Sequence, residues 1–177
     1  MIKFCPLFSS SSGNSVYIGD RDGGVLVDVG RSAKQTREML SKIGVEESAI
    51  KAVFLTHEHS DHTCAIPRVS RIVPLYAHPE TAKAIYDKQK GLLNYKRVDF
   101  YENGFYIGDI EVLPFRISHD AKYPLGYTFR CGDAKISIAT DMGIVAGSVY
   151  QNIKDSQYII FIIPRCVTIN EKSLSKK

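Results

Sequence analysis

Three of the five histidines in this 177-residue chain fall within six residues, in the segment Thr56-His57-Glu58-His59-Ser60-Asp61-His62. A short apolar run that predicts a buried strand stands directly before it. On an extended chain His57 and His59 point the same way, because side chains alternate from face to face. If a helix then begins, Asp61 and His62 lie on its first turn and face back towards the pair. Imidazole and carboxylate together suit zinc, manganese or iron, so the segment predicts a metal centre rather than a solvated polar loop.

The rest of the chain must supply the elements that hold this segment. Apolar periodicity, turn residues and helix-start signals predict a strand-rich opening, an α/β stretch, a second strand-rich stretch and a final α/β stretch. Strands are expected over 2–8, 16–18, 24–29, 51–56, 72–76, 98–101, 105–107, 111–117, 125–131, 135–139 and 157–163, with a loop over 9–14. Helices are expected from Ser32, after His62, from His78-Pro79-Glu80 and over 145–153.

This order of elements predicts an α+β fold in which two sheets are flanked by helices. The length suits a single domain over 1–165, followed by a frayed basic tail over 166–177. Hydrophobic residues at 44% and charged residues at 24% are ordinary for a globular protein, which excludes a disordered or coiled-coil chain. The longest apolar run, 158–164, is far below the ~20 residues of a membrane span. We therefore expect a cytoplasmic protein without a membrane partner.

Cysteine and charge content narrow the chemistry further. The four cysteines, at positions 5, 64, 131 and 166, form no Cys-x-x-Cys pair, so neither a zinc ribbon nor a disulfide framework is expected, and each is interpreted as a small buried hydrophobe. The net charge of +4 permits an anionic substrate without requiring one. Basic residues interleaved with tyrosines over 83–97 could follow a nucleic-acid backbone, although a solvated helix face explains them as well. His78 is interpreted as a helix-capping or surface residue.

The histidine segment resembles the His-x-His-x-Asp-His signature of the metallo-β-lactamase fold superfamily. Three further segments resemble motifs of that superfamily in the same order along the chain, so that the resemblance extends from about residue 4 to 161. These segments are Leu26-Val27-Asp28-Val29-Gly30, Ile117-Ser118-His119-Asp120-Ala121 and Ala139-Thr140-Asp141-Met142-Gly143. The resemblance implies an αβ/βα four-layer sandwich.

The resemblance also implies a role for each matching residue. His57, His59 and His119 would hold a first divalent ion, Zn²⁺ or Mn²⁺. Asp61 and His62 would hold a second ion and carry the catalytic centre, with Asp141 bridging the two. A hydroxide activated by the two metals would then be the nucleophile. Asp28 would orient the metal-binding loop from below, whereas Asp120 is equally well explained as a histidine partner or as an exposed turn residue.

Finer motifs resemble the bacterial YycJ/WalJ subgroup, which is associated with 5′-to-3′ exonuclease activity on DNA. They are Phe8-Ser9-Ser10-Ser11-Ser12-Gly13-Asn14-Ser15, Ser118-His119-Asp120-Ala121 and Pro124-Leu125-Gly126-Tyr127. We therefore expect a metal-dependent phosphodiesterase acting on DNA; hydrolysis of a thioester, lactone or cyclic nucleotide on the same fold is the alternative. Ser12 and Asn14 are candidate phosphate-binding residues, although a plain hairpin turn accounts for them equally well.

The sequence departs from the superfamily pattern in its last part. No histidine follows His119, whereas the superfamily normally supplies one more histidine to the second metal. The resemblance also implies closing strands in the second half of the fold, and we expect them to be missing from this sequence. We therefore expect a weaker second metal site and an open sheet edge that invites homo-oligomer formation. A truncated, catalytically impaired metal-binding remnant remains a further alternative.

Overall fold

The computed structural model describes residues 2–20, 22–89, 95–97 and 104–162. The chain divides into two compact units, Met1–Val98 and Asp99–Lys177, and each unit is built on one sheet with helices. The predicted α+β class is confirmed, while the single-domain boundary stays a prediction. The expected strand over 98–101 and the expected tail over 166–177 lie outside the described residues.

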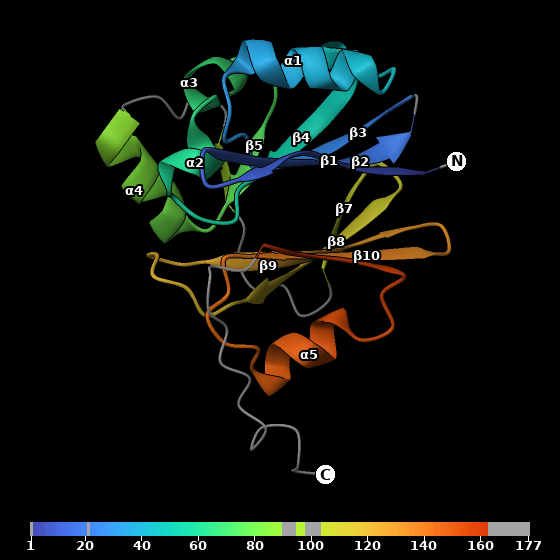
Figure 1. Ribbon diagram of the computed structural model, residues 1–177, viewed down its shortest axis with the longest axis vertical. Coiled ribbons are helices and arrows are strands. Elements are labelled where there is room, and N and C mark those ends of the chain that lie inside the picture. The colour runs from blue at the N-terminus through green and yellow to red at the C-terminus, as the bar shows by residue number, and fades with distance from the viewer. Residues whose placement is uncertain (1, 21, 90–94, 98–103, 163–177) are drawn as a thin grey trace. The chain divides into compact units, whose positions relative to one another are not determined.

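The first unit contains a six-stranded sheet whose strands follow one another in chain order (Figure 1). The first three strands pair antiparallel and the last four pair parallel, so the carboxyl ends of the parallel strands lie at one edge. The strands are β1 (Lys3–Ser10), β2 (Gly13–Asp20), β3 (Gly23–Val27), β4 (Ile50–Phe54), β5 (Leu75–Ala77) and β6 (Tyr95–Arg97).

Helices connect the parallel strands of this unit, and the longest ones begin where the sequence predicts. Ser32 caps α1: its hydroxyl accepts from the Gln35 amide, and Gln35 Oε1 accepts from the Ser32 amide, both at 3.3 Å. Gly44, at φ 71°, follows the end of α1 as expected. The helices are α1 (Ala33–Lys42), the 3₁₀ helix η1 (Glu47–Ala49), α2 (Ser60–Thr63), α3 (Ile66–Val69) and α4 (Pro79–Gln89).

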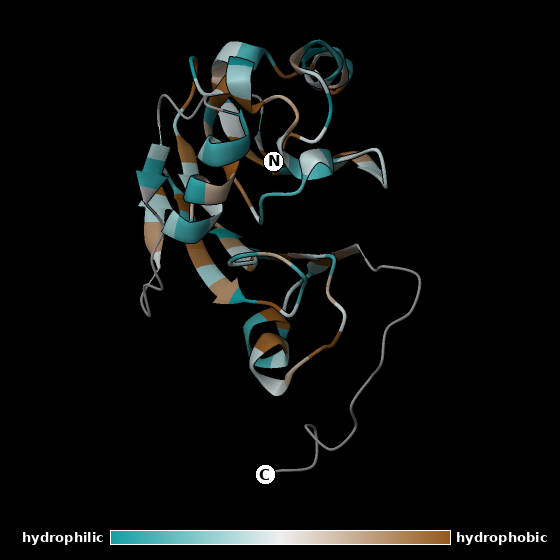
Figure 2. Cartoon of the chain, turned by 90° about the vertical axis from the view of Figure 1, so that its left-hand side faces the viewer, coloured by the Kyte–Doolittle hydropathy of each residue, from teal (hydrophilic) through white to brown (hydrophobic). Residues whose placement is uncertain are grey.

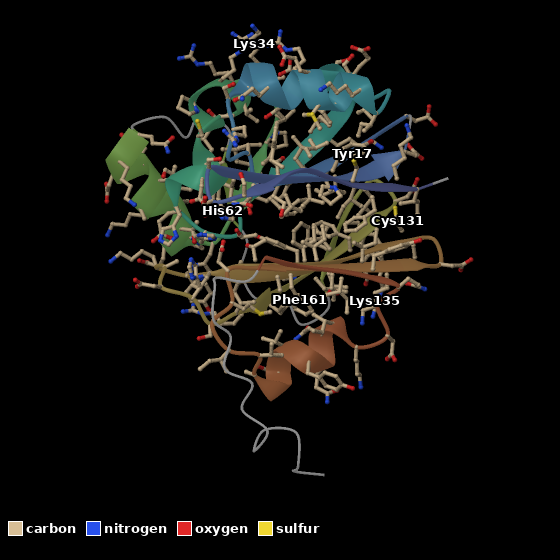
Figure 3. All side chains as sticks on the ribbon, in the orientation of Figure 1. Tyr17, Lys34, His62, Cys131, Lys135 and Phe161 are labelled. Atoms are coloured by element: carbon tan, nitrogen blue, oxygen red, sulfur yellow. The ribbon has the colours of Figure 1, made fainter. Side chains whose placement is uncertain are left out.

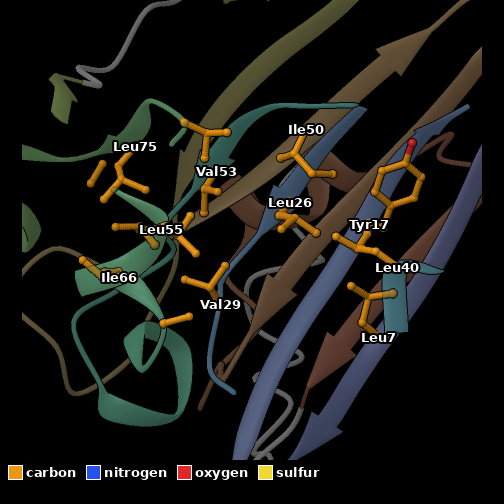
Figure 4. Packing of buried hydrophobic residues seen from close by; sticks show 14 of the residues in the cluster. Leu7, Tyr17, Leu26, Val29, Leu40, Ile50, Val53, Leu55, Ile66 and Leu75 are labelled. Carbon is orange, nitrogen blue, oxygen red and sulfur yellow. The ribbon is translucent and has the colours of Figure 1, made fainter. Parts of the chain in front are cut away.

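The core of the first unit lies between the sheet and the helices that cover it (Figure 4). Leu26 and Val53 from the sheet pack in one cluster with Leu40 of α1 and Ile66 of α3, and all four are buried. Tyr17 of β2 belongs to the same cluster; its hydroxyl donates to the Asp20 carbonyl at 2.6 Å. This packing fixes the strand ends from which the histidine segment emerges.

The second unit contains a five-stranded sheet in the order β11-β10-β9-β8-β7. Four strands form an antiparallel meander, and β11 returns parallel to β10 through α5 (Gly147–Ile153). Helix α5 is amphipathic (Figure 2), and its Val149 and Ile153 pack with Phe115 and Met142. The strands are β7 (Phe105–Ile107), β8 (Ile110–Arg116), β9 (Leu125–Cys131), β10 (Ala134–Thr140) and β11 (Tyr158–Ile162).

The structure corrects the sequence prediction in several places. The loop expected over 9–14 is a tight turn, because β1 runs to Ser10 and β2 begins at Gly13. The strand expected over 72–76 starts only at Leu75, since Pro74 has no amide hydrogen for the sheet. Neither η1 nor β6 was expected. The interpretation of the cysteines as buried is wrong for Cys64, which is exposed, and for Cys5 and Cys131, which are only partly buried; all three are free.

None of the helices in the described ranges is both long enough and apolar enough to cross a lipid bilayer.

Candidate metal centre

A buried carboxylate, Asp28, organises the histidine segment from below. It follows β3 and is 1% exposed. Its Oδ1 accepts from the Thr56 amide at 2.9 Å, and its Oδ2 accepts from the Thr56 hydroxyl at 2.8 Å and from His62 Nδ1 at 2.7 Å. A carboxylate at Nδ1 fixes the proton on that nitrogen and leaves Nε2 as the metal-binding atom of His62. These contacts tie Asp28 to the segment that the resemblance expects it to orient, and its role at a metal stays a prediction.

The histidines converge as their spacing predicts. His57 and His59 lie on the extended segment after β4, and Asp61 and His62 lie on α2, whose His62 is labelled in Figure 3. The ring centroid of His57 is 4.6 Å from that of His59 and 4.1 Å from that of His62. One ring nitrogen of His57 lies within 4.8 Å of a ring nitrogen of each neighbour. Thr56 Oγ1 lies 2.9 Å from His57 Nδ1, which turns Nε2 of His57 towards the cluster.

Asn14 joins the β1–β2 hairpin to this cluster. It is 2% exposed, and its Nδ2 donates to Asp61 Oδ2 at 3.2 Å and lies 3.0 Å from His62 Nε2. Asp61 Oδ2 and His62 Nε2 are also the atoms that would face a cation. Because both contact Asn14 Nδ2, these two acceptors converge on one point. Asn14 is therefore held among the expected ligands, whereas Ser12 is exposed at the hairpin turn.

Gly30 allows the hairpin, the loop after β3 and α2 to meet. Its amide donates to the Asn14 carbonyl at 2.9 Å, and the Val29 amide next to it donates to the His62 carbonyl at 2.8 Å. A Cβ at position 30 would lie 1.6 Å from the Asp61 carbonyl oxygen and 2.5 Å from the Asn14 nitrogen. No side chain fits there, so glycine keeps Asn14 and Asp61 in register.

In the second unit the expected site residues follow the carboxyl ends of β8 and β10, the two strands that flank β9 in the sheet. His119 follows β8 and Asp141 follows β10, and the two segments are tied by a bridge between Ser118 and Ile144 and by the Gly143 amide, which donates to the Ser118 carbonyl at 3.0 Å. Both residues are half-buried, whereas Asp120 is exposed in a turn.

Backbone conformation sets two of the expected site residues apart. Asp28 (φ 60°) and Asp141 (φ 58°) are two of the three non-glycine residues with positive φ in the described part of the chain. Such conformations are uncommon for a residue with a side chain and occur often at functional sites. Sequence patterns alone do not indicate them.

The donor set of the first unit fits a divalent ion. His57 lies beside both His59 and His62, a buried carboxylate orients His62, and Asp61 Oδ2 lies 3.5 Å from His62 Nε2. Neutral imidazole and carboxylate are the ligands that zinc and manganese take in proteins.

Two residues that the sequence analysis did not single out belong to this site. Thr56 was counted only as part of the motif, yet its hydroxyl connects Asp28 to His57. Arg31 lies beside the serine hairpin. The sequence signal that could have identified it is its position directly after Gly30, the last residue of a segment that resembles a superfamily motif. His78, by contrast, caps α4 as predicted, since its Nδ1 accepts from the Glu80 amide at 3.2 Å.

The fold and the histidine cluster define a class of metalloenzyme. The family model of the metallo-beta-lactamase superfamily matches residues 10–153, and the chain belongs to this superfamily. The membership inferred from the sequence motifs is thereby confirmed. Proteins of this superfamily generally bind divalent metal ions.

Curated relatives show which members of the superfamily this chain is similar to. The chain is 31% identical over 169 residues to "Exodeoxyribonuclease YycJ" of Bacillus anthracis, covering 90% of this chain and 62% of that protein. It is 34% identical over 149 residues to "Exodeoxyribonuclease WalJ" of Streptococcus pneumoniae, covering 81% and 55%. The chain thus spans less than two thirds of the length of these relatives.

A solved structure supports the fold alone. The subclass B3 metallo-beta-lactamase MEM-A1, isolated from a soil metagenome library, superposes with a TM-score of 0.65 at 17% identity, over 86% of this chain and 74% of that one.

Proposed function

We propose that this protein is a metal-dependent nuclease that hydrolyses phosphodiester bonds of DNA from the 5′ end. The observation that carries the proposal is the convergence of His57, His59, Asp61 and His62 above Asp28, in a chain that is similar to the two curated exodeoxyribonucleases described above. The relatives' activity belongs to longer proteins, so for this chain it is a proposal. A DNA substrate and free cysteines also support action in the cytoplasm.

The proposed ligand set is the one that the resemblance to the superfamily implies. His57, His59 and His119 would hold one divalent ion, Asp61 and His62 would hold a second, and Asp141 would be a ligand of both. Zn²⁺ and Mn²⁺ both suit these donors. Within the first unit, Asp28 fixes the tautomer of His62 and Asn14 positions Asp61, so the donor atoms are held ready before an ion binds.

Two bound ions would lower the pKa of a shared water and offset the charge that develops on the phosphodiester. The chain's own residues contribute orientation and burial. His57 and His62 are fully buried, which keeps bulk water away from their rings and strengthens electrostatic interactions at the site. Exposed Lys83, Tyr86 and Lys88 on α4 offer charge and a stacking surface for a single strand.

The direct test is cleavage of a 5′-phosphorylated single-stranded oligonucleotide by the purified chain after Mn²⁺ or Zn²⁺ is added. We expect shortening from the 5′ end, loss of activity in His57→Ala and normal activity in the matched control His78→Ala. Cleavage of a chromogenic ester or lactam panel without cleavage of DNA would support the small-molecule alternative. Bound metal with no activity on either substrate would identify an impaired remnant.

We also propose that the edge of the second sheet mediates self-association. Among the described strands β11 pairs with β10 alone, and its Tyr158, Ile159 and Phe161 are 53%, 41% and 37% exposed (Phe161 is labelled in Figure 3). Exposed apolar edge strands favour pairing with another chain. Sedimentation velocity should show a dimer that Ile159→Lys dissociates, while Tyr150→Lys on α5 leaves it intact. A monomer at all concentrations would contradict this.

A further inference from the structure

The guanidinium of Arg31 is held at the turn of the β1–β2 hairpin. Its Nη2 donates to Ser12 Oγ at 2.5 Å and to Ser10 Oγ at 3.4 Å, and its Cζ lies 5.9 Å from the centroid of the Phe8 ring. A Cβ at Gly13 would lie 2.6 Å from Arg31 Cδ, so the absence of a side chain there makes room for the arginine stem. The hairpin therefore fixes a cation in a defined orientation.

This cation has no anionic partner in the part of the chain that the structure describes. Other arginines do: Arg37 pairs with Glu47 at 3.2 Å and Arg130 with Glu111 at 3.1 Å. In addition, the Nε–H of Arg31 is covered and meets no acceptor among the described residues. Arginine that is partly buried normally satisfies its charge with a carboxylate or a phosphate. The Arg31 site thus has the features of an anion-binding site.

Its location connects it to the metal centre within the first unit. Arg31 directly follows Gly30, whose amide donates to the Asn14 carbonyl, and Asn14 in turn contacts Asp61 and His62. The arginine stem packs against Gly13, and Ser12 and Asn14 are the residues before and after Gly13 in the hairpin. An anion at Arg31 would therefore lie beside the hairpin that touches the expected ligands, on the side of the exposed serines.

We propose that Arg31, together with the hydroxyls of Ser10 and Ser12, binds a phosphate group of the nucleic-acid strand and positions that strand against the metal centre. The inference rests on the proposed nuclease function and names the residue that engages the backbone. A guanidinium presents a planar set of donors that matches two phosphate oxygens. Ser10 Oγ donates to the Gly13 carbonyl at 3.4 Å and lies 3.1 Å from Ser12 Oγ. Because hydroxyl hydrogens rotate, the two serines that accept from Arg31 can turn their hydrogens to donate to the same phosphate. Arg31 is a positioning residue, since it acts on a phosphate beside the reacting bond.

A purely structural clamp makes a different prediction. If Arg31 only staples the hairpin, its replacement would lower stability and would leave the affinity for phosphate unchanged in the folded protein. Urea unfolding of every variant therefore accompanies the binding measurements. Arg31→Lys separates the two roles again, because lysine restores the charge without the planar donor pair.

The test is fluorescence anisotropy of the full chain with Mn²⁺ and labelled single-stranded DNA whose phosphorothioate linkages slow hydrolysis. Oligonucleotides with a 5′-phosphate and with a 5′-hydroxyl are compared. We expect Arg31→Ala to weaken binding roughly tenfold or more, the loss typical of one charged hydrogen-bonding contact, and Arg31→Lys to recover part of it. Gly13→Ala, which displaces the arginine without removing its charge, should weaken binding in the same direction. Arg37→Ala on α1 is the matched control and should bind as the wild type does.

The two oligonucleotides identify the source of the phosphate. A loss confined to the 5′-phosphorylated strand indicates a terminal phosphate, and an equal loss with both indicates an internal phosphodiester; either supports the proposal. Folded Arg31→Ala that binds both strands like the wild type overturns it, as does an equal loss in Arg37→Ala, which would indicate only a general charge effect.

Cleavage kinetics separate this inference from the proposed function. If the wild type cleaves DNA and Arg31→Ala raises KM while leaving kcat nearly unchanged, both hold. If Arg31→Ala cleaves DNA with an unchanged KM, the proposed phosphate site is wrong and the proposed nuclease function still holds. Arg31-dependent binding without cleavage by the wild type contradicts the nuclease function and leaves the phosphate site supported.

Discussion

The substitution Asp28→Asn tests how the buried carboxylate governs the metal centre. Asparagine has nearly the same shape and tolerates the left-handed backbone of position 28, so the fold should persist. Its amide oxygen can keep the 2.9 Å contact from the Thr56 amide. Its NH₂ group then replaces Oδ2, where His62 Nδ1 donates at 2.7 Å. Two donors would face each other at that contact.

The magnitude follows from the contacts at Oδ2. The Thr56 hydroxyl can rotate and accept from the new amide, so only the charged hydrogen bond from His62 is lost. Such a bond contributes about 1.5–3 kcal/mol, which is the expected loss in the free energy of unfolding if the ring does not adapt. If His62 changes tautomer, Nδ1 accepts and the hydrogen moves to Nε2, the atom needed for the metal. We then expect metal affinity to fall by roughly 10–100-fold, the range for loss of such a supporting partner.

The assay combines calorimetric titration of the metal-free chain with Mn²⁺ and Zn²⁺, urea unfolding, and ¹⁵N NMR of the His62 ring. Asp22→Asn, on the exposed β2–β3 turn, is the matched control. Wild-type metal affinity in Asp28→Asn, with the hydrogen still on Nδ1, would refute the proposed role of Asp28.

Two other predictions follow from the packing of the first unit. In Gly30→Ala the new Cβ would lie 1.6 Å from the Asp61 carbonyl oxygen, whereas real Cβ atoms essentially never come closer than 3.0 Å to another heavy atom. The backbone must therefore move apart, which separates Asp61 from Asn14. We expect calorimetry to show weaker metal binding. Gly143→Ala, whose Cβ would meet nothing within 4 Å, is its control, and equal affinity in both variants would argue against the close approach. Burial, with a smaller contribution from Asp20, raises the pKa of Tyr17 from 10.0 to about 12. The neutral hydroxyl is therefore favoured in the folded state, and the stability that it contributes, complete below about pH 10, is lost as the pH rises towards 12. Urea unfolding at pH 9 to 11 should show a larger loss in the wild type than in Tyr17→Phe, in which Tyr76, whose pKa burial also raises, still titrates.

The histidine cluster was predictable because its geometry depends on local rules. Alternation along an extended segment and the first turn of a helix bring His57, His59 and His62 together, and both elements are set by short-range sequence signals. The capping of α1 by Ser32 and of α4 by His78 was predictable for the same reason. The expected roles of His119, Asp141 and Asp120 at the metal remain predictions.

Long-range contacts were not predictable from the residues alone. Asn14 is 47 positions from Asp61, and its role depends on the hairpin passing close to Gly30. Arg31 was overlooked because a single arginine after a glycine has no pattern of its own. The exposure of Cys64 was also missed, because it depends on which neighbours the fold places beside it. The length of β5 was missed for a different reason, since Pro74 was a local signal that the strand prediction passed over.

The central claim is that the segment from His57 to His62 binds a divalent metal ion. Titration calorimetry of the metal-free chain with Zn²⁺ and Mn²⁺ tests it most directly, with His57→Ala and the matched His78→Ala variant measured alongside. The structure predicts at least one ion bound per chain in the wild type and in His78→Ala, with much weaker binding in His57→Ala. No binding to the folded wild type, or equal binding in His57→Ala, would contradict the account.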